Sequence, residues 1–205
     1  MKNSVMTVLV FSFLFSSAVV SAQKLRSGNL LVLRGQTLLN LQYDYSGMAV
    51  GKFSNENDYV ADRMADMNKS DPGSGDKWAA KWVSNRASTF QPKFEQELNG
   101  QINQYRIMAK EGQEEAKYTL IIHTTFTEPG FNAFVKKRAE INLTVTLVET
   151  SARDKSLAVI DMPEMKNEQE LFHYGEAYDT GLRISTCYER AGEKLGKFLA
   201  KTVFK

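Results

Sequence analysis

The chain has few of the residues with which enzymes and metal proteins usually do chemistry. Among 205 residues it has one cysteine, Cys187, and two histidines, His123 and His173. A single cysteine excludes a disulfide within the chain. Neither an HxH nor an HExxH spacing is present for zinc, and no GxSxG marks a serine nucleophile. We therefore expect no catalytic residue, no metal ligand and no cofactor, with Cys187 packed or half-exposed and each histidine structural or solvated.

A charge of one dominant sign is also missing. Lys and Arg number 26 against 24 Asp and Glu, so the formal net charge at pH 7 is +2. Proteins that attract nucleic acid or anionic membranes through charge carry a much larger basic excess. We therefore expect neither nucleic acid nor an anionic membrane surface as a partner.

Long apolar runs are absent except at the start of the chain. Residues 1–22 carry one positive charge, Lys2, followed by an uncharged and mostly apolar run that closes on the small residues VSA. This pattern is typical of a secretory signal peptide that is cleaved before Gln23. A retained membrane anchor is the alternative, because the run approaches the ~20 residues that span a bilayer. We expect an exported chain, periplasmic or extracellular, without stable membrane insertion after signal cleavage.

The rest of the sequence is made of apolar segments with two kinds of spacing. Residues 37–45, 116–127 and 137–150 alternate apolar with polar side chains, and 104–111 and 155–162 are further apolar segments, so all five are predicted strands. Helical spacing extends over residues 78–98, with Pro92 in its course, and over residues 182–204. The order is therefore strand, long helix, four strands and long helix.

This order predicts a single α+β domain over residues 23–205. One face of the predicted meander is polar, so both helices belong on the other face. The expected architecture is a two-layer sandwich of a mostly antiparallel sheet, about five strands, with two long helices on one face. Residues 52–75 are interpreted as an irregular excursion, in which Tyr59, Met64 and Met67 could line a short helix.

The last predicted helix contains two glycines one turn apart, Gly192 and Gly196. Each costs about 1 kcal/mol in a helix relative to alanine, so we expect them where this helix closely approaches the sheet or the first helix. The side chains expected in the core are Trp78 or Trp82, Phe94, Ile122, Val145, Leu195 and Phe198.

Two resemblances bear on location and role. The order of the segments "YRIM", "AKYTLII" and "YERAGEKLGKFLA" resembles the periplasmic domains of the TolB amino-terminal, LpoB and CsgG type, over residues 78–205. That resemblance implies a binding module of a bacterial envelope assembly, without catalytic residues. The stretches "YDYSGMAVGKF", "GDKWAAKW" and "FQPKFEQEL" are similar to an uncharacterised exported family of Bacteroidetes, which implies location and supplies no activity.

The two tryptophans, Trp78 and Trp82, lie one helical turn apart behind the turn-forming stretch "SDPGSGD". The glycines do not fit a phosphate loop, because Gly75 is followed by Asp76 where that motif requires lysine. Asp76 is instead expected to cap the helix. The pair is interpreted as an anchor that packs the first helix on the sheet, and the alternative is an aromatic platform for a sugar.

We therefore carry two hypotheses for function. The favoured one is a non-enzymatic binding or accessory protein of the cell envelope, which contacts an envelope protein or complex through the polar sheet face, residues 52–75, or the loop around Phe131 and Phe134. The alternative is a domain that binds a carbohydrate or another small ligand through Trp78 and Trp82. The sequence does not indicate the oligomeric state.

The leader generates the first testable prediction. Intact-mass measurement of the protein from its native host should show a mature chain that begins at Gln23, because signal peptidase cleaves after small residues such as VSA. A full-length chain recovered with the membrane fraction would contradict export as a cleaved protein.

Overall fold

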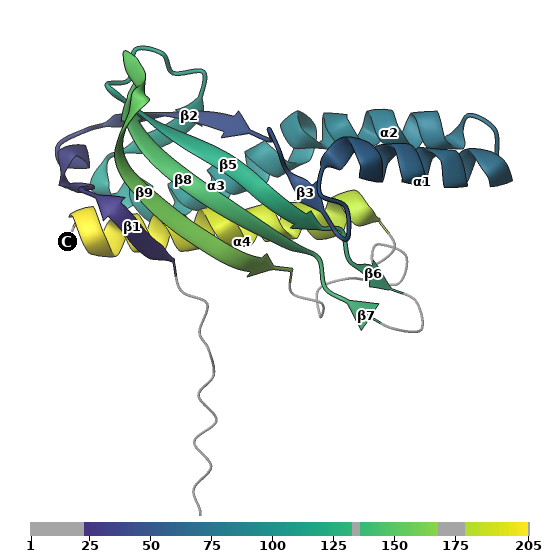
Figure 1. The fold of residues 1–205 in the computed structure, drawn as a ribbon. Helices are drawn as coiled ribbons and strands as arrows, with labels where there is room; N and C mark the ends of the chain where they lie inside the picture. Colours follow the sequence, from purple (N-terminus) through teal and green to yellow (C-terminus); the bar gives the residue numbers. More distant parts are fainter. Residues whose placement is uncertain (1–22, 133–135, 168–178, 205) are drawn as a thin grey trace, which may run out of the picture.

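The fold combines one sheet with helices on a single face (Figure 1). The computed structural model describes residues 23–132, 136–167 and 179–204, so the predicted signal peptide, Phe134 and His173 lie outside it. The strands in these residues are β1 (Lys24–Gly28), β2 (Leu38–Asp44), β3 (Ala49–Val50), β4 (Met108–Glu111), β5 (Tyr118–Glu128), β6 (Phe131–Asn132), β7 (Lys136–Lys137), β8 (Glu140–Glu149) and β9 (Ala152–Lys166). The helices are α1 (Glu56–Ser70), α2 (Ser74–Asn85), α3 (Gln91–Ile102) and α4 (Thr180–Leu199).

Helices α3 and α4 lie along one face of the sheet, whereas α1 and α2 form a helical hairpin that projects beyond its end (Figure 1). The other face of the sheet presents mainly polar, half-exposed side chains such as Asn142, Thr144 and Thr146. The predicted α+β class, with two long helices on one face of a sheet, is confirmed.

The sheet is larger than the predicted five strands, and it is partly parallel. Within the described residues seven strands form it, in the spatial order β1-β9-β8-β5-β2-β4, with β3 paired to β5. The antiparallel meander of β5, β8 and β9 is as predicted, but β2 pairs in parallel with both β4 and β5. Parallel neighbours need a long crossover connection, which the segment containing α1, α2 and α3 supplies between β2 and β4.

Alternation along the central strands is confirmed up to a bulge. In β8 the inward side chains are all buried, namely Ile141, Leu143, Val145 and Leu147. In β5 the register shifts between Thr124 and Phe126. A bulge of this kind inserts one extra residue and reverses the facing of the residues beyond it. As a result Thr127 is buried at the end of the strand, whereas unbroken alternation from Tyr118 would have buried Phe126.

The two glycines of α4 allow this helix to lie directly on α3. A Cβ atom at Gly192 would clash with the carbonyl oxygen of Phe94, and one at Gly196 would lie 3.0 Å from the carbonyl oxygen of Leu98. The predicted core residues Phe94, Ile122, Val145 and Leu195 are buried, and so is Trp82. Phe198 is only partly buried, because the stripe that faces α3 and the sheet continues through Leu199 instead.

The expectation of irregular structure over residues 52–75 is wrong, because most of this segment is helix α1. Asn55 starts the helix by accepting the backbone N–H of Asp58 at 2.9 Å. No residue of α1 is fully buried, so the helix carries no strong apolar stripe. Helix α2 begins at Ser74, and Asp76 accepts the side-chain amide of Asn68 rather than capping the helix.

Pro92 does not break the long helix that follows α2. A π-helical turn, Arg86–Phe90, joins α2 to α3, and Pro92 lies in the first turn of α3, where its missing N–H is tolerated. The ring of Phe90 in this turn stacks on Tyr188 of α4 with centroids 5.2 Å apart. The helical spacing predicted over residues 78–98 is therefore helical in the structure, with Pro92 in the first turn of α3.

The sheet edge at β4 is closed by side chains of α3. The side-chain oxygen of Asn99 accepts the N–H of Ala109 at 2.8 Å, and its amide nitrogen donates to the carbonyl of Ala109 at 2.7 Å. Glu95 accepts the N–H of Glu111 at 3.1 Å. These bonds satisfy backbone groups that would otherwise be open to pairing with another strand.

The contact of α4 with α3 generates the second prediction. Gly192→Ala should lower the free energy of unfolding by about 1–3 kcal/mol, because the new methyl group forces two packed backbones apart. Denaturant unfolding followed by circular dichroism measures this change. Gly100→Ala in α3 is the matched control: nothing lies within 4 Å of its new Cβ. We expect that control to be stabilised by up to about 1 kcal/mol, and equal effects of the two changes would contradict the close approach.

Candidate functional site: a cleft between the helical hairpin and the start of α4

The helical hairpin is held together by a cluster of aromatic rings. Tyr59 of α1 lies with its ring centroid 5.8 Å from Trp78 and 5.1 Å from Trp82, and the two tryptophan centroids are 5.6 Å apart. Trp82 is 6% exposed, whereas Trp78 is only partly buried. The tryptophans therefore pack α2 mainly against α1. This corrects the prediction that they anchor a helix directly on the sheet.

The hairpin is fastened to the sheet by the carboxylate of Glu56, the first residue of α1. This carboxylate accepts hydrogen bonds from the indole N–H of Trp82 and from the guanidinium of Arg86. Arg86 in turn lies over the ring of Tyr45, 4.2 Å from its centroid, just after β2. Glu56 and Arg86 are both about four-fifths buried, with side chains 18% and 20% exposed. Charge-assisted bonds at this depth are stronger than those on an open surface.

The glycines before Trp78 are explained by the turn between α1 and α2. Gly73 adopts φ +85°, a left-handed conformation that suits glycine, and a Cβ at Gly75 would clash with the backbone oxygen of Met64. The side-chain oxygen of Asn68 accepts the N–H of Gly73 at 3.0 Å and that of Gly75 at 2.8 Å. The backbone amides that a phosphate would use are thus already bonded within the turn.

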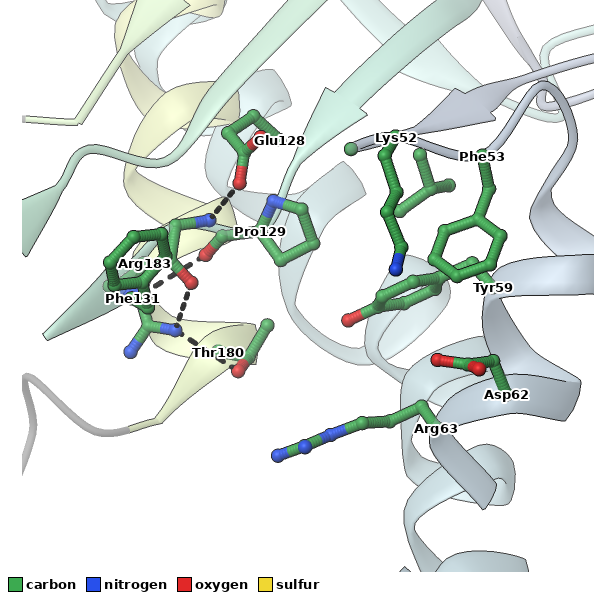
Figure 2. A pocket seen from close by; sticks show the side chains of 13 residues that line it. Lys52, Phe53, Tyr59, Asp62, Arg63, Glu128, Pro129, Phe131, Thr180 and Arg183 are labelled. Atoms are coloured by element: carbon green, nitrogen blue, oxygen red, sulfur yellow. Dashed lines mark hydrogen bonds between the residues drawn. The ribbon is translucent and has the colours of Figure 1, made fainter. Parts of the chain in front are cut away.

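A cavity of about 510 Å³ lies where the hairpin meets the end of the sheet (Figure 2). One wall comes from the β3–α1 segment, and the other comes from the corner after β5 together with the first turn of α4. Figure 2 shows Arg63 extending from the α1 wall toward Thr180 and Arg183 on the opposite side. Side chains of the first wall include Lys52, Phe53, Tyr59, Asp62 and Arg63. Those of the second wall include Glu128, Phe131, Thr180 and Arg183.

A second cavity of about 230 Å³ adjoins the first and shares Arg63 and Thr180 with it. Its remaining lining comes from α2 and from the start of α4, namely Trp78, Lys81, Trp82, Asn85, Asp179 and Gly181. We call the two adjoining cavities together the cleft. The first turn of α4 lines both cavities, the rings of Phe53, Tyr59 and Phe131 line the larger one, and the tryptophans line the smaller one.

Arg183 fixes the wall formed by β5 and α4. It is 6% exposed, and its guanidinium donates to the carbonyls of Pro129 at 3.2 Å and Gly130 at 3.1 Å, and to the hydroxyl of Thr180 at 3.1 Å. Burial lowers the pKa of the guanidinium, which still stays charged at neutral pH. The corner after β5 is therefore held rigidly against the first turn of α4.

Two of the acidic groups that line the cleft are neutralised by ion pairs. Glu128 pairs with Lys137 and also accepts the N–H of Gly130 at 3.0 Å. Asp179 pairs with Lys81 at 3.0 Å. Burial alone would raise the pKa of Asp179, but the hydrogen bonds from Lys81 and from the amide of Leu182 hold it below its ordinary value. Asp179 is thus an anion that ties α2 to α4.

Three of the four contact residues predicted from the sequence border this cleft. Trp78 and Trp82 line the smaller cavity, and Phe131, 45% exposed, lines the larger one. Phe134 lies outside the described residues. Sequence reasoning missed the basic residues Lys52 and Arg63; the only signal was their place in the segment 52–75, which was itself named as a surface for a partner.

Cys187 and His123 do not line the cleft, and both are bonded within the structure. Cys187 is buried, its thiol donates to the carbonyl of Arg183 at 3.4 Å, and burial raises its pKa. A thiol in such surroundings is a poor nucleophile. His123 lies 2.9 Å from the carbonyl oxygen of Ser46 on the polar sheet face. In the part of the chain that the structure describes, no group of three or more His, Cys, Asp or Glu residues is arranged to hold a metal ion.

The helices that the structure describes include none with both the length and the apolar character needed to cross a membrane.

Comparison with known proteins identifies no family. No protein-family model and no curated protein match the sequence. Among solved structures, the PelC dodecamer from Paraburkholderia phytofirmans in space group P6 aligns with a TM-score of 0.40 and 7% identity over 84% of this chain and 97% of that chain. A point variant of the same dodecamer in space group C2 gives 0.37 and 11% identity over 85% and 98%. TM-scores this low support no conclusion about function.

The aromatic cluster generates the third prediction. Trp82→Ala should lower the free energy of unfolding by on the order of 3–5 kcal/mol, because it leaves a cavity and removes a partner from the buried carboxylate of Glu56. Trp78→Ala should cost less, about 1–3 kcal/mol, because part of its ring is already in water. Denaturant unfolding followed by circular dichroism measures both. Stability within about 1 kcal/mol of wild type for Trp82→Ala would mean that the ring does not hold the hairpin.

Proposed function

We propose that this protein is an exported, non-enzymatic binding or accessory protein of the cell envelope, and that the cleft is where it contacts its protein partner. The observation that carries the proposal is the lining of the cleft. Aromatic and charged side chains from three distant parts of the chain converge there on a cavity of about 510 Å³. Concave sites with an apolar lining and a few placed polar groups are the usual form of a binding site.

The way the cleft is built supports binding rather than chemistry. Its buried charges, Arg183 and Glu128, are bonded to the protein's own groups and serve to fix the walls. The groups that remain directed into the space are the flexible side chains Lys52 and Arg63 and the rings of Phe53, Tyr59 and Phe131. Such groups recognise a ligand by charge and apolar contact, and exposed aromatic and arginine side chains are typical of binding surfaces.

A carbohydrate-binding role is the alternative, and one observation favours it. Both tryptophans line the smaller cavity. Against a stacking platform, Trp82 is 6% exposed and its indole N–H is already bonded to Glu56. Trp82 therefore has little open face for a sugar, and we rank this role second.

Site-specific photo-crosslinking in the native host tests the proposal. A photoreactive phenylalanine analogue at Phe131 or Lys52 should form a covalent adduct with one envelope protein, identifiable by mass spectrometry, because both positions line the cleft. The matched control positions are Val83, 54% exposed on the hairpin, and Leu31, 43% exposed in the short helical turn Leu31–Leu33. Neither residue lines the cleft.

Adducts from Val83 or Leu31 with the same protein, at similar yield, would place the contact elsewhere and refute the proposed site. A glycan-array signal that Trp78→Ala abolishes while folding is retained would favour the carbohydrate role.

A further inference from the structure

The cleft has an excess of positive charge where a ligand would enter. Lys81 and Lys137 neutralise Asp179 and Glu128, so these acids add little negative potential. Among the described lining residues, Lys52 and Arg63 then face one acid, Asp62, whereas Arg183 is bonded to groups of the protein itself. Over the whole chain the formal charge is only +2, so the excess is a local property of the cleft rather than a reflection of the protein's composition.

Two of these basic groups are available to a ligand. Lys52 lies 5.1 Å from the ring centroid of Phe53, and among the described residues it has no carboxylate within ion-pair distance. Within the described residues, Arg63 forms an ion pair with Asp66 alone, at 3.7 Å, and both side chains are more than half exposed, at 51% and 67%. Exposed pairs of this kind contribute about 0–1 kcal/mol, so a competing anion displaces Asp66 at little cost.

Apolar surface lies directly beside the charge. The rings of Phe53, Tyr59 and Phe131 line the same cavity as Lys52 and Arg63. Phe131 is 45% exposed, although a large apolar side chain of this kind is normally buried. Aromatic rings next to Lys52 and to the weakly paired Arg63 match a ligand that has both an anionic and an apolar group.

The two adjoining cavities of the cleft have room for more than one group of a ligand. The larger cavity, with the rings, and the smaller cavity, with Trp78 and Trp82, share Arg63 and Thr180 in their lining. A single small anion would leave most of this space unfilled. An extended peptide places successive side chains in adjoining cavities, as in other grooves that bind short segments.

We propose that the cleft binds an acidic segment of the partner polypeptide, with an aspartate or glutamate between Lys52 and Arg63 and a neighbouring aromatic or aliphatic side chain against Phe53, Tyr59 and Phe131. This inference rests on the proposed function, because it names the chemistry of the partner at the same site. Charge complementarity carries it, since like charges would repel a basic segment from Lys52 and Arg63. Asp62 is then the single unfavourable charge that an acidic segment meets.

The test begins with a random-peptide phage library, selected on the full mature protein and counter-selected on the double variant Lys52→Glu/Arg63→Glu. Selected peptides should be enriched in aspartate or glutamate next to Phe, Leu or Tyr. Selection without acidic enrichment would overturn the inference. Sequences that match residues 168–178 of this chain would also overturn it, in favour of an internal occupant.

A selected peptide, synthesised with its acids intact or changed to the corresponding amides, is then titrated against the protein. Both tryptophans of the chain line the smaller cavity, so their fluorescence reports binding directly. We expect the amide peptide and the Lys52→Glu/Arg63→Glu variant each to weaken binding about tenfold or more. Asp62→Asn should tighten binding about two- to threefold, because it removes the unfavourable charge.

The matched control is Lys24→Glu/Lys201→Glu, which changes the net charge equally at exposed positions in β1 and near the C-terminus, away from the hairpin (Figure 1). It should leave the affinity within about twofold, because salt screens charges beyond roughly 10 Å. Equal losses for the two double variants would overturn the inference. A crosslinked partner at Phe131 with no preference for acidic peptides would overturn this inference alone and leave the proposed function standing, whereas crosslinks only at control positions refute both.

Discussion

The structure depends on the direct contact between the backbones of α3 and α4. Gly192 and Gly196 allow α4 to lie against Phe94 and Leu98, and Gly181 allows its first turn to press on Asn85 at the end of α2. A helix held at both ends in this way has little freedom to slide over the sheet. Its first turn, with Thr180 and Arg183, therefore forms a fixed wall of the cleft.

The opposite wall is held by a different kind of interaction. Helix α1 buries no residue fully, so apolar packing on the sheet contributes little to its position. Its place is set by the rings of Tyr59, Trp78 and Trp82 and by the carboxylate of Glu56. The cleft thus lies between two walls of different construction. The α4 wall is fixed by close backbone packing, and the α1 wall is fixed by the carboxylate of Glu56 and three aromatic rings. The second wall has fewer ties to the body of the protein, and we expect it to adjust when a ligand binds.

The sequence was sufficient for the parts of the fold that follow simple periodicities. Alternation identified the inward side chains of β8, and the glycines of α4 correctly indicated a close helix contact. The sequence was insufficient where strand pairing sets the structure. Apolar alternation is the same for parallel and antiparallel neighbours, so it did not show that β2 pairs in parallel with β5. It also did not show the one-residue bulge after Thr124, which reverses the side of the sheet that Phe126 faces. Residues 52–75 were interpreted as irregular, with only a possible short helix, because a helix without a buried stripe has a weak apolar period.

For the candidate site, the sequence indicated Trp78, Trp82 and Phe131 as unusual residues but gave no sign that they lie around one space. Lys52, Arg63 and Arg183 come from three elements whose proximity is created by the fold alone. Arg183 occupies a buried position on α4. A charged side chain at a buried position usually has a structural or a binding role.

Hydrogen–deuterium exchange of the protein, alone and in its native envelope complex, tests the central claim most directly. Protection on binding should be confined to the segments 51–63, 128–131 and 179–183, which line the cleft. Protection of the polar sheet face around Thr144, with those segments unchanged, would contradict it.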